Sequence, residues 1–200
     1  MFPPRVDTIV TEGPIPPSAF QLLPHSSCRP TLERIDVRIF RQDLELDLDI
    51  RLYGSPLRVK LPPWAAMPDR EDELWKTTCF EAFIRPSGGV AYFELNLAPS
   101  GNWAAYRFTS YRAGMRAAAI HCRPDAEIIT EGGIRMQDAT FDLSEENELD
   151  PALGWDVGLS AVIEEIDGTK SYWALAHGSG PPDFHNPTCF AYHLPPFEPE

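Results

Sequence analysis

A strict alternation of apolar and charged residues over positions 44–52 constrains the fold of this chain more than any other feature. Leucine or isoleucine occupies every second position there, and aspartate, glutamate or arginine stands between them. This period of two is typical of a β-strand with one face in a hydrophobic core and the other in water. Similar segments occur at residues 32–40, 79–85, 90–98, 103–111, 134–143, 156–165, 170–177 and 189–194.

Turn-forming residues exclude a helical fold. The 21 prolines and 13 glycines divide the chain into short segments, and no convincing amphipathic helix exceeds about two turns. We therefore predict an all-β fold, an antiparallel, jelly-roll-like β-sandwich of roughly ten strands. Its length of 200 residues with 43% hydrophobic content suits one domain. The sandwich is expected over residues 31–200, with 1–30 as a proline-rich lead-in to the same domain.

Charge limits the partners of the protein. A formal net charge of -13 and an isoelectric point near 4.7 provide no basic footprint for nucleic acid or an anionic membrane surface. A neutral or cationic ligand is easier to accommodate. The N-terminal segment lacks the pattern of a secretory signal, and no run of about 18 apolar residues occurs. We therefore expect a cytoplasmic protein without a membrane partner.

The four cysteines are widely dispersed and form no CxxC pair: Cys28, Cys79, Cys122 and Cys189. This spacing favours buried reduced thiols over a disulfide framework or a zinc site.

The dipeptide Asp-Gly at 167–168 predicts a β-hairpin with a two-residue turn. In this register Gly158 pairs with His177. Trp173 and His177 then share a mostly small, polar face, whereas Tyr172 lies on the core face.

A second hairpin joins residues 79–85 to 90–98. A four-residue loop over 86–89 would pair Glu81 with Glu94. Two directly opposed carboxylates repel, so an arginine, a cation or the hydroxyl groups of a ligand should lie between them. The same face is expected to carry Cys79, Phe83, Tyr92 and Asn96.

Two registers are open for the following strand. One pairs Ala98 with Trp103, which places Arg107 beside Glu94 and keeps the aromatic residues of this strand in the core. The other pairs Ala98 with Asn102 and turns those aromatic residues out. We favour the first because the apolar pattern and the charges agree. The predicted row across three strands, with a tryptophan alongside, is Glu81, Glu94, Arg107, Asn96 and Trp103.

Trp75 precedes the acidic strand and has two interpretations. It can close the end of the sandwich core, or it can form a stacking platform beside the polar row. Sugars present apolar C–H faces to aromatic rings, while carboxylates and amides bind their hydroxyl groups. A tryptophan next to Glu and Asn side chains therefore suits a carbohydrate.

Three segments carry a resemblance to a known family: ELWKTTCFEAFIRP, AYFELNLAPSGNWAAYRF and SYWALAHGSGPPDFHNPTCF. They resemble bacterial DOMON-like domains related to carbohydrate-binding module family nine, and the similarity extends from about Thr31 to Leu194. It implies a β-sandwich that holds a sugar or, in cytochrome members, a haem. In sugar-binding relatives two tryptophans clamp the ring while a Glu and an Asn bind its hydroxyl groups. Trp75, Glu81 and Asn96 match that pattern, and Trp173 is the candidate second wall.

Haem binding is an alternative. Met67, Met115 or Met136 with His177 or His185 could supply axial ligands, although no CxxCH attachment sequence is present and methionine in a sandwich is usually core.

The segment AHGSGPPDFHNPTCF leaves another alternative open, because His177, Asp183 and His185 surround its turn. Such a set can bind a metal ion, although the spacing matches no strong metal motif. In the structural interpretation Asp183 accepts backbone N–H groups of the turn and the histidines bond locally. In a third interpretation the segment contacts a ligand, and His177 is the best candidate because the Asp-Gly register places it on the face of Trp173.

No catalytic constellation is defensible from the sequence, since opposed Glu81 and Glu94 would be close for glycosidase chemistry. We therefore predict non-catalytic binding of a small polar ligand, in particular a saccharide, without a cofactor. The predicted ligand-binding residues are Trp75, Glu81, Glu94, Asn96, Trp103, Arg107, Trp173, His177, Asp183 and His185.

Overall fold

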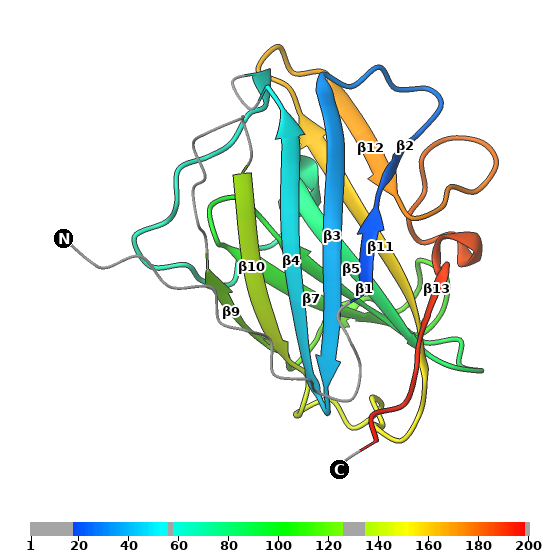
Figure 1. Cartoon of the computed structure of the whole chain (residues 1–200). Helices are drawn as coiled ribbons and strands as arrows, with labels where there is room; N and C mark the ends of the chain where they lie inside the picture. The colour runs from blue at the N-terminus through cyan, green and yellow to red at the C-terminus, as the bar shows by residue number, and fades with distance from the viewer. Residues whose placement is uncertain (1–17, 56–57, 126–134, 199–200) are drawn as a thin grey trace.

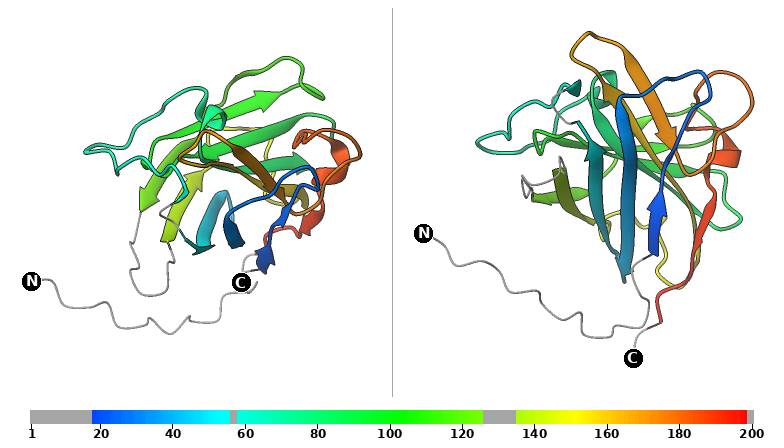
Figure 2. Two further views of the ribbon diagram at one scale, coloured as in Figure 1. Left: turned by 90° about the horizontal axis from the view of Figure 1, so that it is seen from above. Right: turned by 45° about the horizontal axis from the view of Figure 1, so that its top comes forward.

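Two antiparallel β-sheets lie face to face in the computed structural model, which describes residues 18–55, 58–125 and 135–198 (Figures 1 and 2). The smaller sheet has the strand order β1-β3-β4-β10-β9, formed by β1 (Ser18–Gln21), β3 (Leu32–Gln42), β4 (Glu45–Gly54), β10 (Arg135–Asp142) and β9 (His121–Asp125). The prediction of an all-β antiparallel sandwich is confirmed.

The larger sheet has the order β2-β12-β11-β5-β6-β7-β8, and β13 pairs with β11 beside this path. Its strands are β2 (Leu23–Pro24), β12 (Lys170–Ala174), β11 (Trp155–Glu164), β5 (Cys79–Pro86), β6 (Tyr92–Leu97), β7 (Trp103–Phe108), β8 (Arg116–Ala117) and β13 (Tyr192–Leu194). Two single 3-10 turns accompany them, η2 (Leu74–Lys76) and η3 (Pro187–Cys189). The alternation of apolar and polar residues did not reveal the short strands β1, β2, β8 and β9, because two to five residues are too few to show a period of two.

The main hydrophobic core fills the space between the two sheets. The alternating segment 44–52 forms most of β4, and its apolar residues from Leu46 to Leu52 are buried in this core. Of the two short strands at the start of the described chain, β1 pairs with β3 and β2 pairs with β12, so residues 18–24 contribute to both sheets. All four cysteines are free thiols. Within the described ranges, no helix combines the length and the apolar character that crossing a membrane requires.

A second apolar cluster lies on the opposite face of the larger sheet. It contains residues of β5, β6, β7, β11 and β12 together with loop residues: Leu74, Cys79, Phe83, Tyr92, Ala98, Ala104, Tyr106, Phe108, Val162, Ala174 and Phe184. Three connections cover this face, namely the segment that contains η2, the loop after β7 and the loop after β12. The larger sheet is therefore buried on both sides, which explains its nearly continuous burial in β5 and β6.

The hairpin between β11 and β12 differs from its predicted register by one residue. Glu164 pairs with Lys170 and Ala161 with Trp173. The turn is a three-residue loop that ends at Gly168, whose φ is 86°, rather than a two-residue turn. Because the side-chain period of a strand is two, this shift exchanges the faces of β12. Trp173 consequently lies in the core, and Tyr172 lies on the outer face.

The hairpin between β5 and β6 differs by two residues, and its faces are therefore as predicted. Glu81 pairs with Asn96, and Phe83 pairs with Glu94. The two glutamates still share the outer face, but they are diagonal neighbours instead of directly opposed residues. Their repulsion is weaker in this arrangement, because diagonal pairs are separated by roughly 7–8 Å.

The β6–β7 register is the alternative that we did not favour. Ala98 pairs with Asn102 through a backbone N–H···O bond of 2.8 Å, and the loop ends at Gly101 with a φ of 86°. The predicted row of Glu81, Glu94 and Arg107 is therefore wrong. Tyr106 and Phe108 are turned onto the outer face, where the second apolar cluster buries them.

Candidate functional site

A pocket of about 410 Å³ opens on the outer face of the larger sheet. This volume is in the range of small-ligand sites. The strands supply the floor and the three covering connections supply the walls and rim. The residues that line it are Trp75, Glu81, Glu94, Phe108, Arg112, Met115, Val162, Tyr172, Pro182, Asp183, Phe184 and His185.

Two carboxyl groups form the floor. Glu81 comes from β5 and Glu94 from β6, and each residue is only 5% exposed. Ser160 Oγ donates to Glu81 Oε2 at 3.2 Å, while Asn96 Nδ2 donates to Glu94 Oε1 at 2.8 Å. Asn96 is completely buried and also accepts from the Cys79 thiol at 3.4 Å. The sheet therefore fixes both carboxyl groups from below and leaves their other lone pairs facing the pocket.

Burial changes the protonation of this floor. Desolvation, opposed by the hydrogen bond from Asn96 and by the Arg112 charge, raises the pKa of Glu94 from 4.5 to about 7. Desolvation and the nearby charge of Glu94 raise the pKa of Glu81 well above its usual value. Near neutral pH the two carboxyl groups are therefore not both ionised.

His185 lies against the floor without adding a positive charge to it. Its Nδ1 is 2.8 Å from the hydroxyl oxygen of Tyr92, and its Nε2 is 3.7 Å from Glu94 Oε2. Burial and the charge of Arg112 lower the pKa of His185 to about 4. The imidazole is consequently neutral at physiological pH, and it offers Glu94 a polar neighbour rather than a counter-ion.

An ion pair closes one edge of the pocket. Arg112 Nη2 donates to Asp183 Oδ1 at 2.7 Å, and the hydroxyl of Tyr111 donates to Asp183 Oδ2 at 2.7 Å. The Arg112 backbone N–H also donates to Tyr92 Oη at 3.1 Å, and Arg112 has a φ of 52°. These contacts connect the loop after β7 with the loop after β12 and commit the Arg112 guanidinium to Asp183.

Aromatic and aliphatic side chains form the walls. Trp75 projects from η2, is half-buried, and packs edge-on against Tyr106 with ring centroids 5.5 Å apart. Tyr172 and Phe184 lie 6.2 Å apart, and Phe108 is buried nearby. Such walls next to buried carboxyl groups provide both apolar contact area and directional acceptors.

The structure brings five of the ten predicted site residues to the pocket wall or floor: Trp75, Glu81, Glu94, Asp183 and His185. Asn96 lies directly below, bonded to Glu94.

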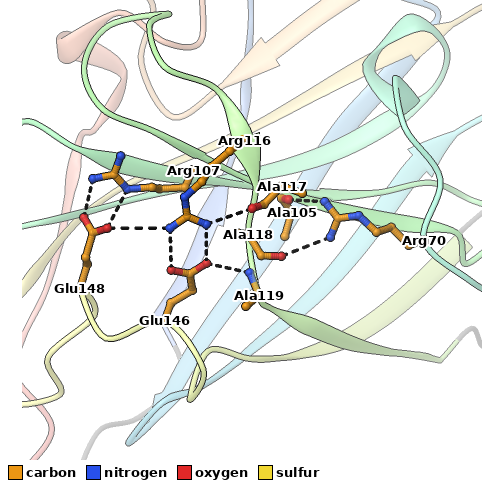
Figure 3. A network of polar contacts seen from close by, with 9 residues as sticks. All are labelled: Arg70, Ala105, Arg107, Arg116, Ala117, Ala118, Ala119, Glu146 and Glu148. Atoms are coloured by element: carbon orange, nitrogen blue, oxygen red, sulfur yellow. Dashed lines mark hydrogen bonds and ion pairs between the residues drawn. The ribbon is translucent and has the colours of Figure 1, made fainter.

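The remaining four predicted residues lie elsewhere. Trp173 is 2% exposed in the main core, where its Nε1 donates to Ser171. Trp103 also belongs to this core. Arg107 forms a bidentate pair with Glu148 at 2.8 and 2.7 Å, beside the pair of Arg116 and Glu146 (Figure 3). His177 Nε2 is 2.8 Å from the backbone oxygen of Leu23. The one-residue register differences explain the first three corrections.

Sequence reasoning missed several lining residues. Tyr172 and Phe108 were assigned to the core by the wrong registers, whereas Arg112, Met115 and Phe184 belong to loops. A loop has no period that reveals which side chains turn inward. The available signal was chemical, since a pair of buried acids requires a nearby polar or cationic group.

The pocket does not fit the metal or haem alternatives. Among the residues that the structure describes, no group of three or more His, Cys, Asp and Glu side chains could hold a metal ion. Met115 and His185 both line the pocket, but the carboxyl floor lies where an apolar macrocycle with anionic propionates would have to bind.

Comparison with solved structures finds a chain that shares the architecture. No family model and no curated protein sequence matches the chain. A crystal structure of a candidate carbohydrate-binding protein from Bacteroides uniformis superposes with a TM-score of 0.59 at 12% identity, covering 86% of this chain and 84% of that one. A carbohydrate-binding module of family nine from Caldicellulosiruptor kristjanssonii in complex with cellotriose gives 0.46 at 10% identity, covering 81% and 75%. A module of the same family and organism in complex with glucose gives a TM-score of 0.41 at 9% identity, covering 77% of this chain and 72% of that one. At these identities, the first superposition establishes similarity of fold.

Proposed function

We propose that the protein is a non-catalytic, DOMON-like binding protein that holds a small saccharide in this pocket. One observation carries the proposal: a half-exposed tryptophan, Trp75, borders a floor of two buried carboxyl groups. A pyranose has the matching chemistry, since its C–H faces stack on an aromatic ring and its hydroxyl groups donate to carboxyl oxygens.

The hydrogen-bond inventory supports a ligand rich in donors. In the described part of the chain, Ser160 is the only side chain that donates to Glu81, and Asn96 is the only one that donates to Glu94 within 3.5 Å. Each carboxylate has about four acceptor sites. Hydroxyl groups that enter the pocket would therefore bond to acceptors that the protein itself leaves to solvent. The fold shared with the Bacteroides protein, described as carbohydrate-binding, adds support.

Binding is favoured over hydrolysis because of where the two acids lie. A glycosidase places its carboxyl groups on either side of the scissile bond. Here both groups belong to adjacent strands of a single floor, each 5% exposed. A ligand would contact them from the same side.

Saturation-transfer NMR tests the proposal on the purified protein with a panel of neutral and amino sugars. Transfer to one or more sugars should disappear in Trp75→Ala. Trp64→Ala is the matched control, because Trp64 is 37% exposed and does not line the pocket. The proposal is contradicted if no sugar shows saturation transfer, or if Trp75→Ala and Trp64→Ala lose the transfer signal equally. An absorption spectrum of the same sample checks for haem, which should be absent.

A further inference from the structure

The charges around the pocket floor do not balance. Titratable groups surround Glu81 and Glu94 on the strands and on two of the three covering connections, whereas the segment with η2 contributes Trp75. They are Cys79, Tyr92 and Tyr172 from the strands, Arg112 from the loop after β7, and Asp183 and His185 from the loop after β12. Only Arg112 among them is cationic at neutral pH. Three carboxyl groups therefore share one guanidinium.

That guanidinium is already committed. Its 2.7 Å bond to Asp183 defines the rim, whereas no salt bridge joins Arg112 to Glu81 or Glu94 within the described residues. Arg112 acts on the floor only through space, where it lowers the pKa of both glutamates without reversing the effect of burial. Neutral His185 is the nearest basic side chain to Glu94, with 3.7 Å between Nε2 and Oε2. The floor thus lacks a contacting cation.

We propose that the saccharide is an amino sugar whose protonated amine binds between Glu81 and Glu94. This inference rests on the proposed function. An ammonium group supplies three N–H donors and a positive charge from a single small atom, so it can bond to both carboxyl groups at once. The remaining hydroxyl groups and the C–H face of the ring would contact the aromatic walls, including Trp75. The overall charge of -13 also favours approach of a cation over an anion.

This mode of binding changes the protonation of the floor. The free pair retains a proton near neutral pH, because burial and mutual repulsion raise the pKa of both groups. An ammonium ion between them stabilises the ionised forms, so binding should release up to about one proton to the buffer. Affinity for the amine should consequently increase from pH 5.5 to pH 7.

Isothermal titration calorimetry distinguishes this inference from general sugar binding. Glucosamine, galactosamine and mannosamine are each compared with the parent hexose and the N-acetyl derivative, both of which are neutral. At pH 7 at least one amino sugar should bind about 10- to 100-fold more tightly than its two neutral counterparts, the ratio expected for a charge-assisted hydrogen bond in a desolvated site. Heats measured in two buffers with different ionisation enthalpies, neither a primary amine, should report proton release.

Variants localise the effect. Glu81→Gln and Glu94→Gln keep the side-chain shape and should reduce the preference for the amine to about threefold or less. Glu45→Gln removes the same charge from an exposed carboxylate of β4 that pairs with Arg123, and should leave the preference unchanged. Proton release is measured on the wild-type protein, so the inference remains testable even if a variant misfolds.

The outcomes separate the two proposals. If the parent hexoses bind as tightly as the amino sugars and the signal depends on Trp75, the inference is overturned and saccharide binding stands. The inference also fails if an amino sugar binds preferentially without proton release, or if Glu81→Gln and Glu94→Gln keep the preference of the wild-type protein. In either case the amine nitrogen of the sugar does not bind at this floor. Absence of binding by every sugar overturns both proposals.

Discussion

Replacement of Glu94 by glutamine should stabilise the protein above neutral pH, which is unusual for a change at a buried polar residue. Folding raises the pKa of Glu94 from 4.5 to about 7. The native state therefore binds this proton more tightly than the unfolded state, and the resulting stability is complete below pH 4.5 and is lost as pH rises through 7. At about 1.4 kcal/mol per tenfold change in proton affinity, the loss is about 3 kcal/mol.

Glutamine cannot ionise and can keep the bond from Asn96, so the variant should escape this loss. At pH 4.5 the two proteins should have similar free energies of unfolding. At pH 8 the variant should be more stable by about 3 kcal/mol, which corresponds to a melting temperature higher by roughly 6–12 °C. Glu81→Gln should act in the same direction, because burial and the charge of Glu94 raise the pKa of Glu81.

Urea unfolding followed by tryptophan fluorescence at pH 4.5, 6, 7 and 8 measures the difference directly. Carboxyl groups elsewhere titrate in both proteins and cancel in the comparison. Two results would refute the reasoning: free energies that differ by the same amount at every pH, or a variant that is less stable than the wild type at pH 8. Either would mean that folding does not raise the proton affinity of this carboxyl group.

Three further predictions concern the packing and the rim. Trp173→Phe should lower the free energy of unfolding by about 2 kcal/mol in urea titrations and leave sugar affinity unchanged, because the indole lies in the main core. Gly168→Ala should cost about 1 kcal/mol in the same assay through its φ of 86° alone, since a Cβ there would meet nothing within 4 Å. Asp183→Asn should free Arg112 to approach Glu94 and weaken amino-sugar binding about 5- to 10-fold by calorimetry, whereas unchanged affinity would show that the ion pair has no influence on the floor.

The layers of the fold could be predicted from sequence because the strand pattern repeats along the chain. Faces were correct for β5 and β6, even though their pairing differed from the expectation by two residues. An even error preserves which side chains point inward, and the Glu81 and Glu94 side chains were therefore assigned to a shared face despite an incorrect partner for each.

A register error of one residue exchanges the two faces of a strand. It occurred in the β6–β7 and β11–β12 hairpins for the same physical reason. In both, a three-residue loop ends in glycine with a φ of 86°, at Gly101 and Gly168. The glycine N–H donates to the carbonyl oxygen of the residue just after the first strand at 2.9 Å, and the N–H of that residue donates to the carbonyl oxygen of the residue just before the second strand at 2.8 Å. Glycine at the third loop position was visible in the sequence. The outer face of the larger sheet is also buried, so an aromatic side chain is covered on either face, and an apolar pattern that assumes one buried face does not identify the correct register.

The loop residues of the site could not be deduced in the same way. Arg112 reaches the rim through a positive φ and a backbone bond to Tyr92, both of which depend on the packed sheet beneath them. Arg112 matters to the site because its charge lowers the pKa of Glu81 and Glu94, and both glutamates are distant from it in the sequence.

The burial of the larger sheet on both sides also bears on how such a pocket could change over evolutionary time or in a selection experiment. Along β5 and β6, side chains that hold the two sheets together alternate with side chains that form the pocket floor or its surroundings. Mutations at the outward positions can therefore change ligand recognition, while the inward side chains between them keep the two sheets packed together. A combinatorial library aimed at new ligand specificity would diversify the outward positions alone: Cys79, Glu81, Phe83, Tyr92, Glu94 and Asn96.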